Sequence, residues 1–273
     1  MFECVINISE GRDLSILDEL SYSAGQSLRD RHPDRFHNRS VFTLINSAPV
    51  LLSDVHHIVD VAMSRLDLAP HEGVHPRLGV VDVVPFVALD PQESAMARHL
   101  RDNTARWIAD TFDVPVFLYG ALNKEERTLP FVRRHAFTDL AADFGPQRPD
   151  PQRGAVVVGA RELLVAWNLW LHHATLDDAR RIAQSVRRTG VRALGLQVGA
   201  DVQVSCNLVD LNLAVPSQIF DQVSQCLKPP AHIARAELVG LIPQMLLSRE
   251  EPGRWVQLGL SQAVTIESRI APR

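Results

Sequence analysis

The alternation of short apolar segments with longer amphipathic ones constrains the fold of this chain most strongly. In residues 13–28, for example, Leu17, Leu20 and Ala24 recur at the spacing of one helix face. The alternation is interrupted at residues 143–154, where the sequence DFGPQRPDPQRG is rich in proline, and it then restarts. This pattern predicts two α/β units, with an ordered loop or a linker at the interruption.

The second half of the chain has the order of one known unit. Its predicted elements are strand, helix, two strands, helix and strand, in residues 155–171, 176–189, 191–198, 202–210, 216–227 and 234–243. This order is the ferredoxin-like split β-α-β-β-α-β unit, and the first half shows a related but longer alternation. We therefore predict an α+β fold of two α/β subdomains, each a ferredoxin-like mixed sheet with helices mainly on one face. We expect these subdomains, residues 1–161 and 162–273, to face a ligand crevice.

Two segments of the first half carry prolines that affect their interpretation. Residues 29–38 are polar and contain Pro33, which favours a loop. Residues 80–89 form an apolar strand interrupted by Pro85, which predicts a position near a sheet edge or a bulge.

Composition excludes several classes of protein. The residues are 46% hydrophobic and 22% charged, the net charge is -4, and the basic residues form no run, which argues against nucleic-acid binding. The sequence has no signal peptide at its start and no apolar stretch near the ~20 residues that span a bilayer. Its three cysteines are far apart and predict no disulfide framework. We expect a cytoplasmic protein with no membrane partner.

Residues 71–75 match the zinc-peptidase motif H-E-x-x-H, but their context argues against a zinc site. The motif needs a helix, so that both imidazoles share a face. Gly73 disfavours a helix by ~1 kcal/mol, and Pro76 pushes His75 out of the helical region. The adjacent pairs His56–His57 and His172–His173 should point apart, so no metal site is predicted.

The same segment nevertheless contains a concentration of chemically active side chains. His71, Glu72, His75 and Arg77 lie on a loop before a strand that contains Asp82. A carboxylate in such an apolar strand must have a partner if it is buried. Function is often carried by loops of this kind on a rigid scaffold, so we expect a ligand site here.

Nine segments in order resemble one protein family. They are ECVINISEGRD, HNRSVFTLIN, HEGVHPRLGVVDVVPFVAL, VPVFLYG, RTLP, DFGP, AVVVGARELLVAWNLWL, VQVSCNLVD and AELVGLIP. Each is weak alone, but together they resemble the formiminotransferase domain of glutamate formiminotransferase from residue 3 to roughly residue 247. The resemblance implies two subdomains with a folate site, and the transfer of a formimino group from N-formimino-L-glutamate to tetrahydrofolate.

The resemblance also assigns residues to roles. The catalytic histidine of the family is the one in its HPR motif, which here is His75, so the zinc-motif match is accidental. The family's folate-binding loop begins at the GP after DF, which implies that the segment Gly145, Pro146, Arg148, Arg153 and Gly154 contacts folate. Tetrahydrofolate is then a co-substrate, and no metal is implied.

The implied chemistry suits these residue types. An amine attacks an amidine carbon, so one nitrogen loses a proton and another gains one, and a histidine can serve both steps. Asp82 or Glu72 could hold the cationic carbon or orient His75. Both substrates carry carboxylates that arginines bind, and the candidates are Arg39, Arg77, Arg148 and Arg153. Asn7 could present its amide to the pterin.

The sequence departs from the family pattern near the expected site. The family has an apolar strand ending in acidic residues before HNR, whereas this chain has RDRHPDRF, with Asp34 as the candidate replacement. Val74 stands where the family has Glu before its histidine. Two alternatives therefore stay open: a transferase that uses a formyl donor, and a non-catalytic homologue that binds folate or another small molecule. We expect a stand-alone member without the cyclodeaminase domain, either a monomer or a homodimer.

Overall fold

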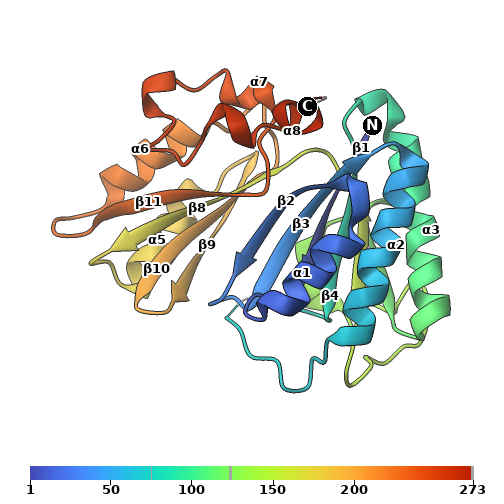
Figure 1. Cartoon of the computed structure of the whole chain (residues 1–273). Coiled ribbons are helices and arrows are strands. Elements are labelled where there is room, and N and C mark those ends of the chain that lie inside the picture. Colours follow the sequence, from blue (N-terminus) through green and yellow to red (C-terminus); the bar gives the residue numbers. More distant parts are fainter. Residues whose placement is uncertain (75, 123–124, 272–273) are drawn as a thin grey trace. The chain divides into compact units, whose positions relative to one another are not determined.

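The computed structural model describes residues 1–74, 76–122 and 125–271. The chain divides into two compact units, Met1–Glu162 and Leu163–Arg273 (Figure 1). Each unit is built on its own sheet and has its own hydrophobic core, as the α+β prediction requires. Within the described ranges, no helix has the length and hydrophobicity needed to cross a bilayer.

The first unit contains a seven-stranded mixed sheet in the order β2-β3-β1-β4-β7-β5-β6. Neighbouring strands are antiparallel except that β7 runs parallel to both β4 and β5. The strands are β1 (Phe2–Ile8), β2 (Leu28–Asp34), β3 (Arg39–Asn46), β4 (Val81–Ala88), β5 (Val116–Leu122), β6 (Glu125–Arg127) and β7 (Val156–Ala160).

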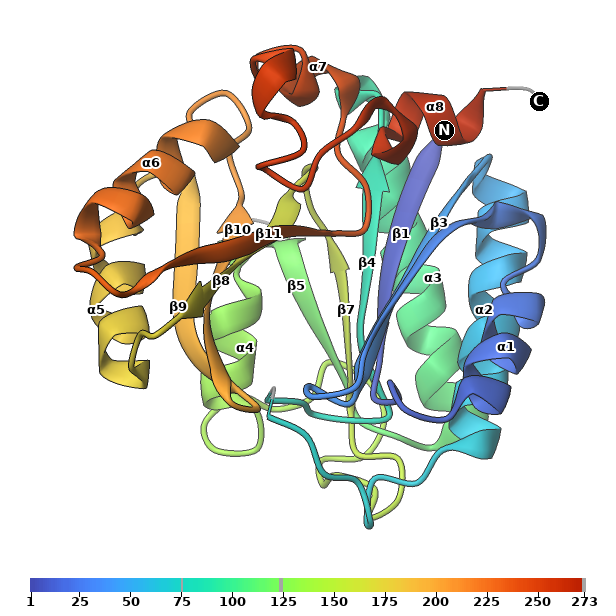
Figure 2. The same cartoon turned by 60° about the vertical axis from the view of Figure 1, so that its left-hand side comes forward.

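Three helices cover one face of this sheet, and a short fourth helix packs on the other face (Figure 2). The first three are α1 (Leu14–Ser23), α2 (Ala48–Arg65) and α3 (Ser94–Phe112), and the fourth is α4 (Leu129–His135). Alternate residues of β1, namely Cys4, Ile6 and Ile8, enter the core beneath the three helices. The helices therefore lie mainly on one face, as predicted.

The first six elements of this unit repeat the split unit predicted for the second half. Strands β2, β3, β1 and β4 lie side by side, and α1 and α2 connect them in the order β-α-β-β-α-β. The prediction of a loop at residues 29–38 was wrong, because Leu28–Asp34 pairs with β3. As an edge strand it can leave its polar side chains partly exposed, and it tolerates Pro33.

Pro85 does not mark a sheet edge. Strand β4 lies between β1 and β7, and Pro85 is opposite Gly159 of β7. The pairing of β1 with β4 is irregular instead, with a register shift between Asn7 and Ile8. This shift lies opposite Val81 and Val83, so Pro85 is near a bulge, which is the second of the two predicted positions.

The second unit has the predicted ferredoxin-like order. Its sheet runs β11-β8-β10-β9, formed by β8 (Val165–His172), β9 (Val191–Val198), β10 (Asp201–Leu208) and β11 (His232–Val239). Helices α5 (Leu176–Val186) and α6 (Pro216–Cys226) pack on the sheet through a shared core, and Thr175 with Asp178 forms a capping box at the start of α5. The C-terminal part adds the short helices α7 (Gln244–Leu247) and α8 (Ile266–Ile270).

Candidate functional site

The candidate segments from the sequence meet at one end of the strands of the first sheet. Because β1 is antiparallel to β3 and β4, its end lies beside the β2–β3 turn and the start of β4. Strand β7 is parallel to β4, so the loop that precedes β7 reaches the same end of the sheet. Loop segments therefore converge there, namely residues 9–12, 35–38, 66–74, 76–80 and 145–155.

Asn38 joins three of these segments. Its Oδ1 accepts a hydrogen bond from the Gly11 amide (3.1 Å), and its Nδ2 donates to the Glu72 carbonyl (2.9 Å). Its own carbonyl lies 2.9 Å from Nε2 of His71. Asn38 has a positive φ of 46°, a conformation that asparagine tolerates better than most residues. The buried amide thus fixes the loop before β4 to the ends of β1 and β2.

His71 is held as a neutral imidazole. Its Nδ1 lies against the Arg77 guanidinium, which can only donate, so its Nε2 carries the proton toward the Asn38 carbonyl. Burial and the nearby charge of Arg77 lower the pKa of His71. Both ring nitrogens are thus occupied, and residues 71–74 and 76–79 form no helix. A zinc peptidase requires the opposite on both points.

Arg77 and Arg39 differ in their surroundings. Arg77 also donates to the Gly73 carbonyl (2.7 Å), so its side chain binds the backbone of the same loop four residues earlier. Arg39 donates to Oδ1 of Asn7, which is diagonal to it across the β1–β3 pair. Burial lowers the pKa of Arg39 to about 10, with Asp82 acting to raise it and Arg77 to lower it. These contacts join four candidate residues in one cluster: Asn7, Arg39, Arg77 and Asp82.

Asp82 is buried, with 1% of its surface exposed, and protein donors bind both of its oxygens. Oδ1 accepts from the Leu78 amide (2.9 Å), and Oδ2 pairs with Nη2 of Arg133 (2.5 Å). Arg133 also donates from Nη1 to the Pro76 carbonyl (2.9 Å). The required partner of the buried carboxylate is thus Arg133 on α4, and the pair holds the backbone on one side of residue 75.

The proline-rich segment is an ordered loop closed upon itself. The main chains of Asp150 and Gly154 exchange two hydrogen bonds, and the Asp150 carboxylate accepts the amides of Gln152 and Arg153. Gly154 also forms a bridge with Gly79 at the start of β4. The predicted folate loop is therefore attached to the loop that contains the HPR sequence.

The other predicted residues of this loop lie in different environments. The Arg153 guanidinium donates to the Met63 and Phe112 carbonyls, near the ends of α2 and α3 (3.2 and 3.4 Å). Arg148 is exposed and makes no hydrogen bond or ion pair within the described ranges. Gly145 has a φ of 76°, and Pro146 after it is half-buried. Arg148 is thus the arginine of this loop whose charge is available to a ligand.

Asp34, the candidate replacement for the acid that the resemblance implies, ends β2 three residues before His37 of the HNR sequence. Its Oδ1 accepts the amides of Phe36 and His37 (2.8 Å each), which closes the β2–β3 turn. Asp34 also acts to raise the pKa of Arg39, so its charge reaches the cluster. His75, the predicted catalytic residue, lies outside the described residues.

Comparison with known proteins places this arrangement in a family. A model described as the formiminotransferase domain, N-terminal subdomain, matches residues 1–161. A glutamate formimidoyltransferase of Streptococcus pyogenes serotype M1 is 30% identical over 268 residues, which cover 90% of each chain. The chain belongs to the formiminotransferase family.

Other relatives of this formiminotransferase-family chain differ in length. The glutamate formimidoyltransferase of Thermoplasma acidophilum is 28% identical over 90% of this chain and 89% of its own. The formimidoyltransferase-cyclodeaminase of Gallus gallus is 30% identical over 89% of this chain but only 50% of its own. The chain thus spans about half the length of the cyclodeaminase relatives it matches.

Arg133 and Asn38 are the site residues of this family member that sequence reasoning did not select. The sequence signal for Asn38 is its place in HNR, directly before the candidate Arg39. Arg133 follows RTLP by three positions, and the only sequence signal was that Asp82 needed a buried partner.

A histidine cluster in the second unit was also missed. The rings of His172, His173 and His232 have centroids 5.8–6.2 Å apart. The expectation that His172 and His173 point apart was wrong, because His173 leaves the strand with a φ of 57°. Among the described residues, no group of three potential ligands is arranged to hold a metal ion.

Proposed function

We propose that this protein transfers a formimino group from N-formimino-L-glutamate to tetrahydrofolate, giving glutamate and 5-formiminotetrahydrofolate. The observation that carries the proposal is the similarity to a protein named glutamate formimidoyltransferase over 90% of both chains. The cluster of Asn7, Arg39, Arg77 and Asp82 at one end of the strands supports it, because its arginines can bind the carboxylates that both substrates carry.

We assign acid–base catalysis to His75. The folate amine forms a bond to the amidine carbon, and the bond from that carbon to the glutamate nitrogen breaks. The attacking nitrogen loses a proton and the departing nitrogen gains one, so a single histidine accepts and then returns a proton. The motif match supports this assignment, and Glu72, Pro76 and Leu78 of the same loop are hydrogen-bonded to Asn38, Arg133 and Asp82.

The arginines and Asn7 bind substrate in this proposal. Arg39 and Arg77 provide positive charge for substrate carboxylates at the ends of the strands, and Arg148 does so on the loop of residues 145–154. Asp82 balances the arginine charges and holds the loop, because both of its oxygens are occupied by protein donors. The cytoplasmic location and the absence of nucleic-acid and membrane partners stay predictions from composition.

Turnover is the deciding experiment. Purified protein is mixed with tetrahydrofolate and N-formimino-L-glutamate, and both products are followed, with a chelator-treated sample beside it. We expect turnover that the chelator does not change. Protein that binds tetrahydrofolate without turnover would contradict the proposal and favour a formyl donor or a binding role. Loss of activity with chelator would contradict the metal-free mechanism.

A further inference from the structure

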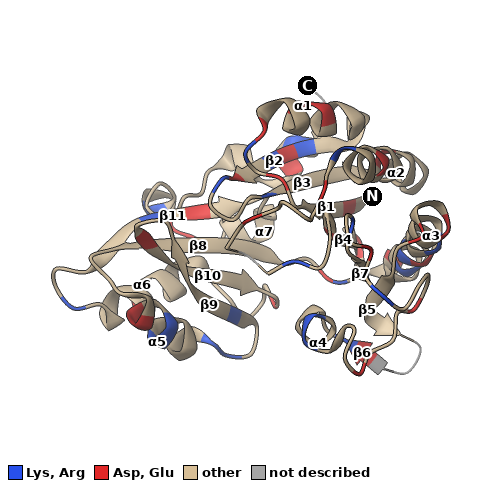
Figure 3. Cartoon of the chain, turned by 90° about the horizontal axis from the view of Figure 1, so that it is seen from below, with Lys and Arg blue, Asp and Glu red and all other residues tan. Residues whose placement is uncertain are grey.

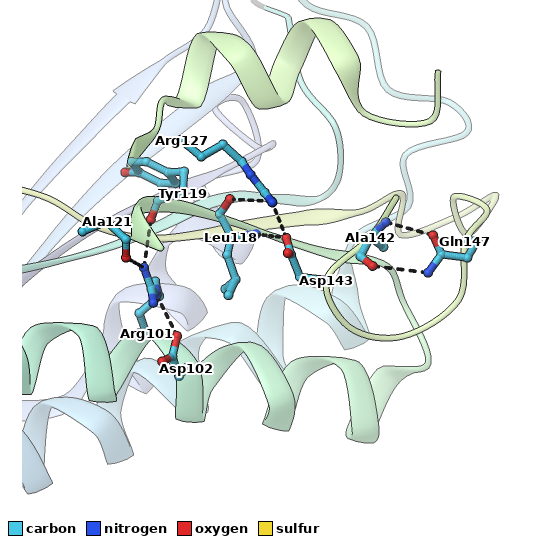
Figure 4. Close-up of polar contacts among 9 residues, drawn as sticks. All are labelled: Arg101, Asp102, Leu118, Tyr119, Ala121, Arg127, Ala142, Asp143 and Gln147. Carbon is cyan, nitrogen blue, oxygen red and sulfur yellow. Dashed lines mark hydrogen bonds and ion pairs between the residues drawn. The ribbon is translucent and has the colours of Figure 1, made fainter. Parts of the chain in front are cut away.

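Strand β6 and helix α4 hold two site loops through two different arginines. The first is Arg127, at the end of β6. Its Nη1 pairs with Oδ2 of Asp143 (2.7 Å), and the same oxygen accepts the Leu118 amide (2.7 Å) (Figure 4). Asp143 and Phe144 also pair with the backbone of Val116 at the start of β5. Arg127 therefore fixes the entrance of the loop that begins at Gly145.

The second arginine is Arg133, six residues further along the chain. It holds the other loop at two points, directly through the Pro76 carbonyl and indirectly through Asp82, which accepts the Leu78 amide. Pro76 follows residue 75 immediately. Because Asp82 is buried, its ion pair is screened less by solvent than a surface pair, and losing one partner is costly.

The element that joins these arginines is rigid. Helix α4 starts at a Thr128 cap, whose hydroxyl accepts the Phe131 amide (3.3 Å). Val132 is fully buried in a cluster that also contains Phe117 and Tyr119 of β5. The helix carries a second arginine, Arg134, which is exposed. Figure 3 shows the basic part of α4 in blue. A short, anchored element thus separates two arginines with distinct targets.

We propose that residues 125–135, the β6–α4 brace, are a positioning element that sets the two site loops independently. Arg133 positions the backbone beside His75, and Arg127 positions the folate-type loop that starts at Gly145. Neither arginine is a catalytic residue. The inference rests on the proposed function for its kinetic consequences, but the loop restraints themselves do not depend on it.

Steady-state kinetics distinguishes the role of Arg133 from that of Arg127. Arg133→Met should lower kcat roughly 100-fold with the KM for tetrahydrofolate nearly unchanged, because small misplacements of a reacting group have effects of that size. Arg127→Met should raise this KM roughly 10-fold with kcat nearly unchanged. Arg133→Lys should recover part of the loss, because lysine can still neutralise Asp82. Arg134→Met, on the exposed side of the same helix, is the matched control and should behave as wild type.

Amide hydrogen exchange tests the brace even in the absence of turnover. Arg133→Met should accelerate exchange at Leu78 but not at Leu118, and Arg127→Met should do the reverse, since each amide binds one of the two aspartates. If Arg133→Met does not fold, the double variant Asp82→Asn with Arg133→Met removes the unpaired charge and keeps an acceptor for Leu78. Its expected result is a kcat lowered in the same way, through the lost bond to Pro76.

Three outcomes would overturn the proposal. The first is that either variant accelerates exchange equally at Leu78 and Leu118, and the second is that neither variant changes exchange at these amides. The third is that Arg133→Met and Arg127→Met have identical kinetic effects. A wild-type protein without turnover would reject the proposed function alone. In that case the exchange pattern still decides whether the two arginines restrain separate loops.

Discussion

Gly154 lies so close to Leu78 that a Cβ atom on it would stand 2.2 Å from the Leu78 carbonyl oxygen. Its φ of 74° is also unfavourable for any residue with a side chain. Gly154→Ala should therefore lower the free energy of unfolding by roughly 1–3 kcal/mol and separate the two site loops. Urea titration measures the first effect, and the KM for tetrahydrofolate measures the second.

Gly253 is the control for this substitution, because a Cβ there meets no atom within 4 Å. Gly253→Ala should leave both quantities unchanged. A Gly154→Ala protein with wild-type stability and KM would show that the close contact between the loops has no consequence.

His56 on α2 stacks on Trp107 of α3, with ring centroids 3.8 Å apart. Burial first, and then His57, lowers the pKa of His56 from 6.5 to about 4. Below pH 6.5 the unfolded chain therefore binds a proton at His56 that the folded chain does not bind. The contribution of His56 to the free energy of unfolding is thus present above this pH and is lost as the pH falls toward 4. We expect the melting temperature to fall across this window, and less so in His56→Leu.

His57 is exposed beside it, so His57→Leu is the matched variant and should keep most of the pH dependence. Tryptophan fluorescence gives a second readout, because a proton on His56 changes the environment of Trp107. Identical melting curves for wild type and His56→Leu from pH 7 to pH 4 would contradict the shift.

Glu3 on β1 is buried, and burial raises its pKa from 4.5 to about 7, with Arg161 acting in the opposite direction. The folded protein keeps the proton where the unfolded chain has lost it, so this contribution to stability is present below pH 4.5 and is lost as the pH rises toward 7. Glu3→Gln should therefore gain stability relative to wild type between pH 5 and pH 8, by roughly 1–3 kcal/mol.

Chemical denaturation at the two pH values measures this gain, with the exposed Glu251→Gln as control. A difference between Glu3→Gln and wild type that stays constant with pH would show that Glu3 titrates normally in the folded protein.

Sequence patterns predicted the second unit well, because its strands are apolar or alternate in polarity and α5 and α6 each have one apolar face. The same reasoning failed at Leu28–Asp34, since an edge strand is paired on one side only and can be polar throughout. The expectation from Pro85 was met in its second form, because the strand is not at an edge but the pairing of β1 with β4 shifts register nearby, opposite Val81 and Val83.

The roles of the candidate site residues stay predictions, but the structure shows how these residues are connected. Asn7, Arg39 and Asp82 were chosen for the chemistry of their side chains, and they lie in one cluster with Arg77. Arg133 could not be found, since no local pattern states which of several arginines will reach a carboxylate 51 residues away in sequence. Long-range pairing of this kind depends on the tertiary fold.

The two histidines of the HEGVH sequence should differ sharply in their contribution to turnover. His75→Ala should lower the rate by roughly 10²–10⁴-fold while folding and tetrahydrofolate affinity change little, because acid–base transfer is lost. His71→Ala removes hydrogen bonds to Arg77 and Asn38, so it should lower stability by about 1 kcal/mol and reduce the rate far less. Steady-state kinetics with thermal melts measures both. A near-normal rate in His75→Ala would remove its catalytic role, whereas equal losses in both variants, reversed by added zinc, would return the metal-site interpretation of this loop.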